Sequence, residues 1–207
     1  QVLEMKLLFE GIFQQYGYDF REYSQDSMWR RIEHRCQMWK LPNVSALTHR
    51  VLHDREAFAV LVNELTTNVS EMFRNPAFFL ALRHKVLPYL ASFPHIRCWV
   101  AGCANGEEAY SLAILLQELG LYSRAQIYAT DLDVLALQRA REGIYPASAA
   151  PTFTRNYQQS GGTQPFTDYY HSGYDNILIE EHLKKNIVFS QHNLVTDGDF
   201  NEMHFIS

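Results

Sequence analysis

Two glutamates that directly follow a glycine-containing turn are the residues best suited to bind a ligand. The turn includes Gly102 and Gly106, and Glu107 and Glu108 follow it. The glycine spacing differs from the dinucleotide fingerprint, and no Gly-Lys-Ser/Thr sequence follows as in a Walker loop. Two carboxylates at the start of a helix would also repel a pyrophosphate. The turn therefore favours a ligand with a positive group and no phosphate. S-adenosylmethionine (SAM), which has a sulfonium and an ammonium group, fits that description.

The elements around this turn place it at one edge of a parallel sheet. The apolar run Cys98–Ala101 predicts a buried strand, and leucines at helical spacing after Glu107 predict a helix. Strand, turn and helix in this order place a ligand at the carboxyl ends of the strands. Residues 125–130 predict the next strand, which ends at Asp131. A carboxylate there can accept hydrogen bonds from ribose hydroxyls, whereas Asp133 is the better candidate to cap the helix that follows.

The polar stretch over residues 65–76 is the second candidate for ligand binding. Asn68 or Ser70 can cap a short helix, and Pro76 is typical of the first turn of a helix. The stretch falls between a helical region and the α/β region, where ligand sites often lie. The guanidinium of Arg74 suits a carboxylate, and we expect it to orient a charged group.

The composition argues against several classes of protein. Apolar residues make up 47% and charged residues 20% of the 207 residues, an ordinary globular balance that allows a sizeable core. No apolar run is long enough for a membrane span, and we expect no signal peptide. The net charge of −5 argues against a basic nucleic-acid-binding surface. Three cysteines without CxxC spacing predict free thiols, and the pair His49/His53 lacks a third ligand nearby, so no metal site is predicted.

Residues 1–64 predict a domain made of helices. The apolar stripe of its first helix is expected to consist of Leu3, Leu7, Leu8 and Ile12. A second helix, over about residues 25–40, is locally basic. Its arginines include Arg30, Arg31 and Arg35. A basic helix face is usually only solvated, and the functional alternative is a docking surface for an acidic protein partner.

The pattern becomes irregular after the second strand and its helix. Between about residues 146 and 172 the only helical signal lies around residues 152–159. Ile187–Gln191 then predicts a third parallel strand, which Asn193 and Leu194 close at the ligand edge. A fourth strand is expected to begin near the end of the chain.

These stretches together resemble the chemotaxis receptor methyltransferase family (CheR), glutamate O-methyltransferases that use SAM and release S-adenosylhomocysteine. The order and spacing of five motifs carry the resemblance, and the helical N-terminal region agrees with it. The motifs are Leu65-Thr-Thr-Asn-x-Ser-x-x-Phe-Arg74, Trp99-x-Ala-x-x-x-x-Gly-Glu-Glu-x-Tyr-Ser111, Ala129-Thr-Asp-Leu-Asp133, Ala140-Arg-x-Gly-Ile-Tyr145 and Val188-Phe-x-x-x-Asn-Leu194.

The resemblance implies where the cofactor and the receptor would bind. The family's cofactor contacts would fall on Asn68, Ser70, Arg74, Glu108, Asp131, Asn193 and Leu194. Gly102 joins this set as part of the glycine turn, Glu108 would hold the methionine ammonium and Asp131 the ribose. Arg74 is the predicted catalytic residue. The family's second helix is basic and faces the receptor, which implies docking through Arg30, Arg31 and Arg35.

The predicted fold class is α/β, with three parts. They are an all-α helical domain (1–64), a linker and helix (65–92) and a truncated, Rossmann-like class I SAM-dependent methyltransferase domain (93–207). The family's chain continues past Ser207 with a Cys-Arg-Asn motif, further strands and a small β-subdomain, which we expect to be missing here.

The predicted function is glutamate methyl-ester formation on a chemotaxis receptor. The partner would be the cytoplasmic helical region of that receptor, and the protein would be cytoplasmic, without nucleic acid or membrane insertion. One alternative is a non-catalytic SAM-binding docking module of a larger signalling protein. A class I methyltransferase that acts on a small molecule or a nucleic acid is a further rival.

Overall fold

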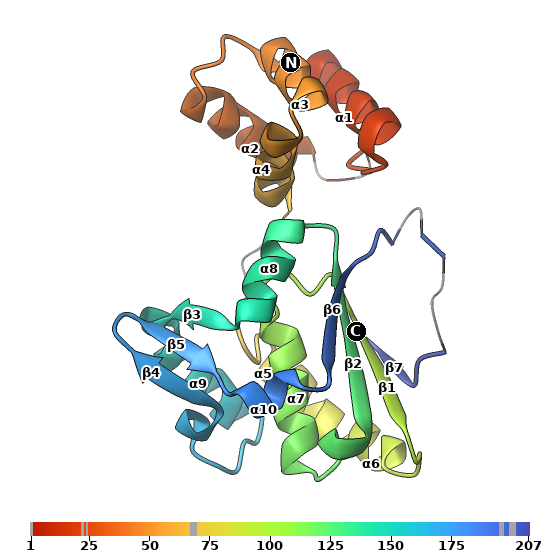
Figure 1. Cartoon of the computed structure of the whole chain (residues 1–207), viewed down its shortest axis with the longest axis vertical. Helices are drawn as coiled ribbons and strands as arrows, with labels where there is room; N and C mark the ends of the chain where they lie inside the picture. The colour runs from red at the N-terminus through yellow and green to blue at the C-terminus, as the bar shows by residue number, and fades with distance from the viewer. Residues whose placement is uncertain (1, 22, 24, 67–69, 195–196, 199–201) are drawn as a thin grey trace. The chain divides into compact units, whose positions relative to one another are not determined.

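The chain folds into two compact units, each with its own buried apolar core. The structure is a computed structural model that describes residues 2–21, 23, 25–66, 70–194, 197–198 and 202–207. Unit 1 comprises Gln1–Asn68 and Asn193–Gly198, and unit 2 comprises Val69–His192 and Asp199–Ser207. Figure 1 labels the α-helices and the strands of both units.

The described part of unit 1 is helical, as the sequence predicts. Its helices are α1 (Val2–Tyr16), α2 (Gln25–Met38), α3 (Val44–His53) and α4 (Arg55–Leu65). Capping side chains mark the starts of α3 and α4, because Asn43 accepts a hydrogen bond from Ala46 N and Asp54 accepts one from Glu56 N, both at 2.9 Å. These caps fix where each helix begins.

The apolar stripe of α1 differs from the predicted one. Leu8 and Ile12 are fully buried, but Leu3 is 69% and Leu7 is 59% exposed. The buried face consists of Met5, Leu8, Phe9 and Ile12. This is the i, i+3, i+4, i+7 spacing of one helix face, from which Leu3 and Leu7 are rotated away. The prediction was wrong for these two leucines because the sequence offers two overlapping apolar stripes.

A parallel sheet forms the centre of unit 2. Its strands are β1 (Ile96–Ala101), β2 (Ala125–Asp131), β6 (Ile187–Gln191) and β7 (Phe205–Ile206), in the order β6-β2-β1-β7. Ala101 pairs with Thr130, and Thr130 pairs with Ser190, so the three longer strands end at one edge. The glycine turn and the start of α7 (Glu107–Glu118) follow β1 at this edge. The predicted strands, turn and helix are confirmed, and with them the mixed α/β class.

Helices before β1 and after β2 belong to the same unit as the parallel sheet. Before β1 come α5 (Pro76–Ala81), the π-helical η1 (Leu82–Val86) and α6 (Leu87–Leu90), and after β2 comes α8 (Val134–Glu142). Pro76 lies in the first turn of α5, as predicted, and Asn75 caps this helix. Buried Phe79 and Leu87 belong to the same apolar core as Ile96 of β1. The stretch that leads into the sheet therefore belongs to unit 2.

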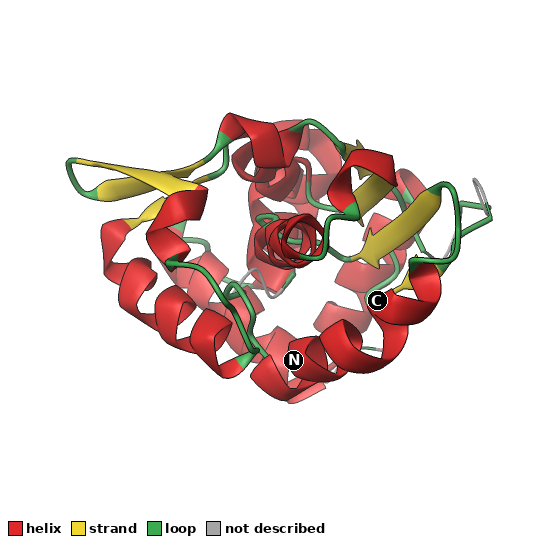
Figure 2. Cartoon of the chain, turned by 90° about the horizontal axis from the view of Figure 1, so that it is seen from below, coloured by secondary structure: helices red, strands yellow, loops and turns green. Residues whose placement is uncertain are grey.

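A small antiparallel sheet lies between β2 and β6 in the chain. It consists of β3 (Ile144–Pro146), β4 (Tyr170–Gly173) and β5 (Asn176–Ile179), in the order β3-β5-β4. Figures 1 and 2 show this sheet and the parallel sheet on opposite sides, with helices between them. The further short elements are η2 (Tyr122–Arg124), η3 (Ala147–Ala149), α9 (Ala150–Gln159), η4 (Phe166–Tyr169) and α10 (Glu181–Lys184).

This small sheet corrects two predictions. The excursion over residues 146–172 contains more than a helical signal, since β4 begins at Tyr170. A small β-subdomain is also present, although we expected it to be missing. Each of its strands has only three or four residues, too few for a clear periodicity. Only β5 overlaps a stretch, residues 177–182, that the sequence marks as strand or short-element material.

Candidate functional site

The glycine turn is bound to the end of β2 by backbone hydrogen bonds. Gly102 N and Cys103 N donate to the carbonyl of Thr130 at 2.8 and 2.9 Å. Ala104 N donates to Asp131 Oδ2 at 2.8 Å. Gly102 has a φ of 75°, and Ala104 has a φ of 48° in the left-handed region that non-glycine residues rarely adopt. The carboxylate of Asp131 therefore holds a strained turn in place at the edge of the sheet.

Asp131 and Asp133 have different hydrogen-bond partners, and only Asp133 caps a helix. Asp133 accepts hydrogen bonds from Leu135 N at 2.9 Å and Ala136 N at 3.2 Å, so it caps α8 as predicted. Asp131 instead accepts from Asp133 N through Oδ1 at 2.9 Å. Burial raises the pKa of Asp131, although hydrogen bonds from the backbone of Asp133, Ala104 and Leu132 favour the ionised form. Each Asp131 oxygen keeps acceptor capacity for a hydroxyl group.

Gly106 must be a glycine for α7 to start where it does. Its φ is 91°, and a Cβ atom at this position would lie 3.0 Å from the Cβ of Ala140 and 3.3 Å from the ring of Phe189. The first turn of α7 therefore packs directly against α8 and β6. This close approach explains the second glycine of the turn.

The two glutamates after the turn have different surroundings. Glu107 is 4% exposed, and its Oε2 is a buried atom without a hydrogen-bond partner in the described part of the chain. Burial raises the pKa of Glu107 to about 7. Glu108 is half-buried, and its Oε1 accepts a hydrogen bond from the Ser207 hydroxyl at 2.5 Å. The buried, unpartnered oxygen of Glu107 is suited to receive a cation.

The loop before α5 is attached to the same helix. Phe73 is fully buried with a φ of 54°, and its N donates to Ser111 Oγ at 2.9 Å. Ser111 Oγ in turn donates to the carbonyl of Glu107 at 2.7 Å. On the other side of the loop, Asn156 Nδ2 donates to Glu71 Oε2 and to the carbonyl of Met72, both at 3.1 Å. The loop that carries the predicted ligand residues is thus fixed beside the first turns of α7.

The structure brings most of the predicted cofactor residues into unit 2. Those in unit 2 are Ser70, Arg74, Gly102, Glu108 and Asp131. Asn68 lies outside the described residues. Strand β6 ends at Gln191, before Asn193, and Asn193 and Leu194 are grouped with unit 1. Within that unit Asn193 Nδ2 donates to the carbonyl of Gly17 at 2.8 Å. In the sequence Glu107 shares with Glu108 the prediction of a positively charged ligand, but it is not among the predicted cofactor contacts, because its burial cannot be seen in the sequence.

All three predicted docking arginines make contacts within unit 1, and two of them bind α4. Arg31 Nη1 donates to carbonyl groups at the end of α4, and Arg35 Nε donates to the Glu64 carboxylate. Arg30 is exposed, and its Nε donates to the carbonyl of Asp26 at 3.3 Å. Two of the basic side chains of α2, Arg31 and Arg35, therefore bind α4.

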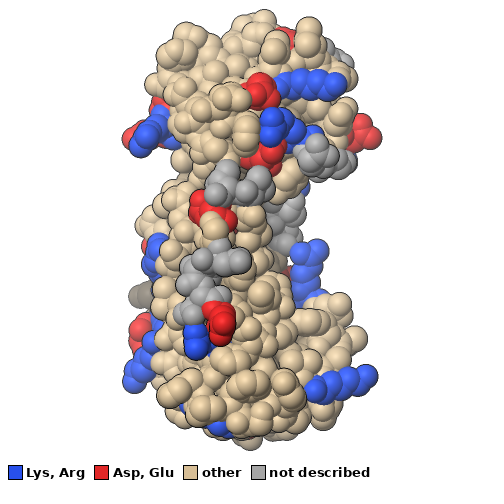
Figure 3. All heavy atoms as spheres, turned by 90° about the vertical axis from the view of Figure 1, so that its right-hand side faces the viewer, with Lys and Arg blue, Asp and Glu red and all other residues tan. Residues whose placement is uncertain are grey.

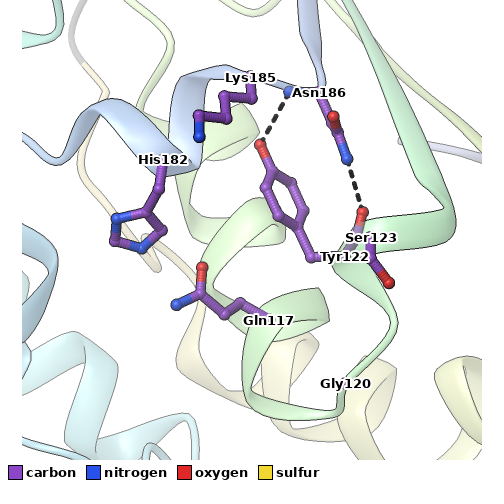
Figure 4. A pocket seen from close by; sticks show the side chains of 7 residues that line it. All are labelled: Gln117, Gly120, Tyr122, Ser123, His182, Lys185 and Asn186. Atoms are coloured by element: carbon purple, nitrogen blue, oxygen red, sulfur yellow. Dashed lines mark hydrogen bonds between the residues drawn. The ribbon is translucent and has the colours of Figure 1, made fainter.

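A hollow of about 500 Å³ lies at the opposite edge of the parallel sheet (Figure 4). It is lined by Gln117, Gly120, Tyr122, Ser123, His182, Lys185 and Asn186. Asn186 connects its walls, because its N donates to the Tyr122 hydroxyl at 3.2 Å and its Nδ2 to the Tyr122 carbonyl at 2.7 Å. Ser123 and Asn186 precede β2 and β6, so the hollow lies at the amino ends of these strands. It is distinct from the glycine-turn site.

Surface charge, metal ligands, membrane-spanning helices and cysteines can each indicate another kind of site in the described residues. On the face drawn in Figure 3, basic and acidic side chains are interspersed, and wide areas carry neither. Within the described ranges no group of three or more His, Cys, Asp or Glu side chains could hold a metal ion. Among the helices of those same residues, none combines the length and the apolar character needed to cross a bilayer. Cys36, Cys98 and Cys103 are free and buried, as predicted.

Comparison with known sequences decides the family. The model of the CheR methyltransferase SAM-binding domain matches residues 68–206, and the model of the CheR methyltransferase all-alpha domain matches residues 3–66. The chain belongs to the CheR methyltransferase family. The predicted family and fold are therefore confirmed, namely an all-α domain followed by a Rossmann-like SAM-binding domain.

Individual relatives of this CheR-type chain differ in length. A Pseudomonas putida protein named as methyltransferase Cher3 is 45% identical over 99% of this chain and 75% of its own length. A chemotaxis protein methyltransferase of Listeria monocytogenes is 31% identical over 87% of this chain and 67% of its own. An uncharacterized 104.1 kDa protein of Rhodobacter capsulatus is 29% identical over 91% of this chain, which corresponds to only 20% of that protein.

Proposed function

We propose that this chain binds SAM at the glycine-turn edge of its parallel sheet and methylates glutamate side chains of chemotaxis receptors. The buried, unpartnered Oε2 of Glu107 supports the cofactor part of this proposal most directly. A buried carboxylate needs a compensating partner, and the ammonium group of SAM supplies one. Family membership supports methyl transfer as the reaction.

The residues around the turn would each bind a different group of the cofactor. Glu107 is our first candidate to hold the ammonium, with Glu108, the residue that the resemblance implies, as the competing candidate. Asp131 would accept hydrogen bonds from the ribose, in keeping with its place at the carboxyl end of β2. Gly102 would allow the backbone to approach the ligand closely. The remaining proposed contacts are Asn68, Ser70, Arg74, Asn193 and Leu194.

Methyl transfer to a glutamate side chain needs no strong general acid or base. A glutamate has an ordinary pKa near 4.3, so the accepting carboxylate is already ionised at neutral pH. Bound SAM supplies the methyl group: a carboxylate oxygen forms a bond to the methyl carbon, the carbon–sulfur bond breaks, and S-adenosylhomocysteine leaves with the electron pair. The chain would contribute alignment and exclusion of water. Arg74 would orient one of the charged reactants.

The protein partner would be the cytoplasmic helical region of a chemoreceptor, and the reaction would take place in the cytoplasm. Arg30 is the most available of the three predicted docking arginines, since Arg31 and Arg35 already bind α4. Esterification removes one negative charge from each modified glutamate. Such a change can alter the packing of a charged helical bundle.

A non-catalytic SAM-binding module is the second candidate function. The Rhodobacter capsulatus relative supports it, because a similar sequence there forms a small part of a much larger protein. Such a module would bind SAM without transferring the methyl group. Transfer to a receptor therefore has to be tested separately from binding.

Calorimetric titration with SAM and S-adenosylhomocysteine tests the cofactor site. We expect micromolar binding by the wild type and loss of binding in the Asp131→Ala variant. A second experiment mixes the protein and methyl-labelled SAM with a receptor fragment and measures label that is released by mild alkali, as a methyl ester is. A folded wild-type protein that binds neither ligand would contradict the cofactor proposal. Binding without transfer would favour the non-catalytic module.

A further inference from the structure

The sequence motif over residues 140–145 contacts the glycine turn through its last residue, Tyr145. This residue lies in the middle of β3, between two exposed neighbours, and is itself only 5% exposed. Its hydroxyl donates a hydrogen bond to the carbonyl of Asn105 at 2.7 Å. Asn105 lies between Ala104 and Gly106, so this bond connects the small antiparallel sheet to the turn. The cofactor contacts that the resemblance implies include no residue of this motif.

The position of the Tyr145 ring is fixed by its own surroundings. Its backbone pairs with Ile177 of β5. The ring packs edge-on against the rings of Tyr110 and Phe153, with centroid distances of 6.4 and 5.8 Å. Burial raises the pKa of Tyr145 well above its ordinary value, so the hydroxyl keeps its proton and remains a donor. The hydroxyl therefore reaches Asn105 from a well-defined position.

The turn depends on such contacts because its backbone is strained. Ala104 has a φ of 48°, a left-handed conformation that persists only when surrounding contacts enforce it. The carboxylate of Asp131 accepts a hydrogen bond from Ala104 N at 2.8 Å. The next residue, Asn105, is bound through its carbonyl by Tyr145. One of these two contacts comes from the parallel sheet and the other from the antiparallel sheet, and together they hold the strained conformation.

The same turn leads directly into the carboxylate that we propose binds the ammonium of SAM. Gly106 and Glu107 follow Asn105 in the chain. Burial raises the pKa of Glu107 to about 7, and a hydrogen bond from the Asn105 side chain is among the contacts that oppose this rise. Asn105 thus contacts Glu107 through its side chain and Tyr145 through its carbonyl. A change in the conformation of Asn105 therefore affects the Glu107 carboxylate directly.

We propose that Tyr145 is a positioning residue for SAM binding, which acts by holding the glycine turn through the hydrogen bond to Asn105. This inference rests on the proposed binding of SAM at this turn. Without the hydroxyl, the strained turn adopts other conformations in part of the molecules. The apparent dissociation constant of SAM then increases by the inverse of the fraction of molecules that remains competent to bind. In this role Tyr145 does not touch the reacting atoms.

Titration calorimetry with SAM compares two variants that each lose one buried tyrosine hydroxyl. Tyr145→Phe keeps the ring contacts and removes the donor to Asn105, and we expect it to weaken SAM binding about fivefold. Tyr122→Phe is the matched control. The Tyr122 hydroxyl also donates to a carbonyl, that of Leu183, and accepts from Asn186 N, but it lies at the opposite edge of the parallel sheet. This control should lose stability and still bind SAM like the wild type.

Amide hydrogen exchange of the protein without SAM measures the opening of the turn itself. The amides of Gly102, Cys103 and Ala104 donate to the end of β2. They should lose most of their protection from exchange in Tyr145→Phe and keep it in Tyr122→Phe. In a methyl-transfer assay with receptor fragment, Tyr145→Phe should raise the KM for SAM about fivefold and leave kcat at saturating SAM unchanged.

Other results would contradict the inference. A Tyr145→Phe variant that binds SAM as tightly as the wild type overturns it, whatever the change in thermal stability. Equal weakening of SAM binding in Tyr122→Phe does so too, because the effect would then follow from lost stability and not from the turn. A lower kcat with an unchanged KM for SAM removes Tyr145 from cofactor binding. A wild type that binds no SAM contradicts the proposed function itself, whereas unchanged amide exchange in Tyr145→Phe contradicts the positioning role alone.

Discussion

SAM binding should become tighter as the pH rises from 5.5 to 7, because Glu107 has to lose its proton before it can pair with the ammonium. Burial raises the pKa of Glu107 from 4.5 to about 7, which corresponds to about 3 kcal/mol in favour of the protonated form. About half of the Glu107 side chains are ionised at pH 7 and about 3% at pH 5.5. The affinity should therefore rise about fifteenfold over this range. An α-amino group, with a pKa near 8, stays mostly protonated throughout.

Titration calorimetry at several pH values, in two buffers with different ionisation enthalpies, measures this effect. At pH 7 the wild type should release about half a proton for each SAM bound. Glu107→Gln should bind weakly at every pH and release no proton from this site. Glu108→Gln is the matched control one residue along the helix, and it should keep the pH dependence of the wild type.

The same pKa predicts the stability of the protein without SAM. Between pH 4.5 and 7 the folded state binds more protons at Glu107 than the unfolded state does. The contribution of this group to stability therefore falls as the pH rises through this range.

An affinity of the wild type for SAM that does not change between pH 5.5 and 7 would refute the reasoning. If the pH dependence disappears in Glu108→Gln and persists in Glu107→Gln, the ammonium belongs to Glu108.

Other substitutions test the elements that hold the site in place. Gly106→Ala should lower the free energy of unfolding by about 1–3 kcal/mol in urea titrations, while Gly173→Ala, which has open space around it, should change it by less than about 0.5 kcal/mol. Glu118→Gln leaves the buried Arg83 without its anionic partner and should cost about 3–5 kcal/mol in the same assay. Although burial opposes ionisation of Glu118, its hydrogen bonds lower its pKa below 4.5. Its contribution to stability is thus present above about pH 4.5 and is lost as the pH falls through that lower pKa. Arg74→Ala should reduce methyl transfer at saturating SAM about a hundredfold, and a variant with full turnover would remove Arg74 from the mechanism.

The parts of the fold that repeat a local pattern could be predicted from the sequence. Helix α7 and strand β2 were placed correctly because a long helix and a buried strand each impose a periodicity on their apolar residues. The cap at Asp133 and the proline at the start of α5 follow from the unpaired groups at helix ends. The glycine turn could also be located, because Gly106 meets a steric requirement that no other residue satisfies.

Features that depend on distant contacts could not be predicted in this way. The strands of the antiparallel sheet are too short to show a period, and β4 reaches its partner β5 only through a tight turn. Asn193 lies next to Gly17, a residue 176 positions earlier in the chain. The three arginines of α2 look equivalent in the sequence. Only the packing of α2 against α4 shows that Arg31 reaches backbone carbonyl groups while Arg30 remains exposed.

The sequence alone could not show which of the adjacent residues Glu107 and Glu108 is buried. Adjacent residues of a helix point about 100° apart, so only one of the two glutamates can face the interior. In the folded chain Glu107 is the buried one, at 4% exposure, while Glu108 is half-buried and accepts a hydrogen bond from the hydroxyl of Ser207. An ammonium group gains more from a carboxylate that water does not reach, and for this reason Glu107 is our first candidate to hold it.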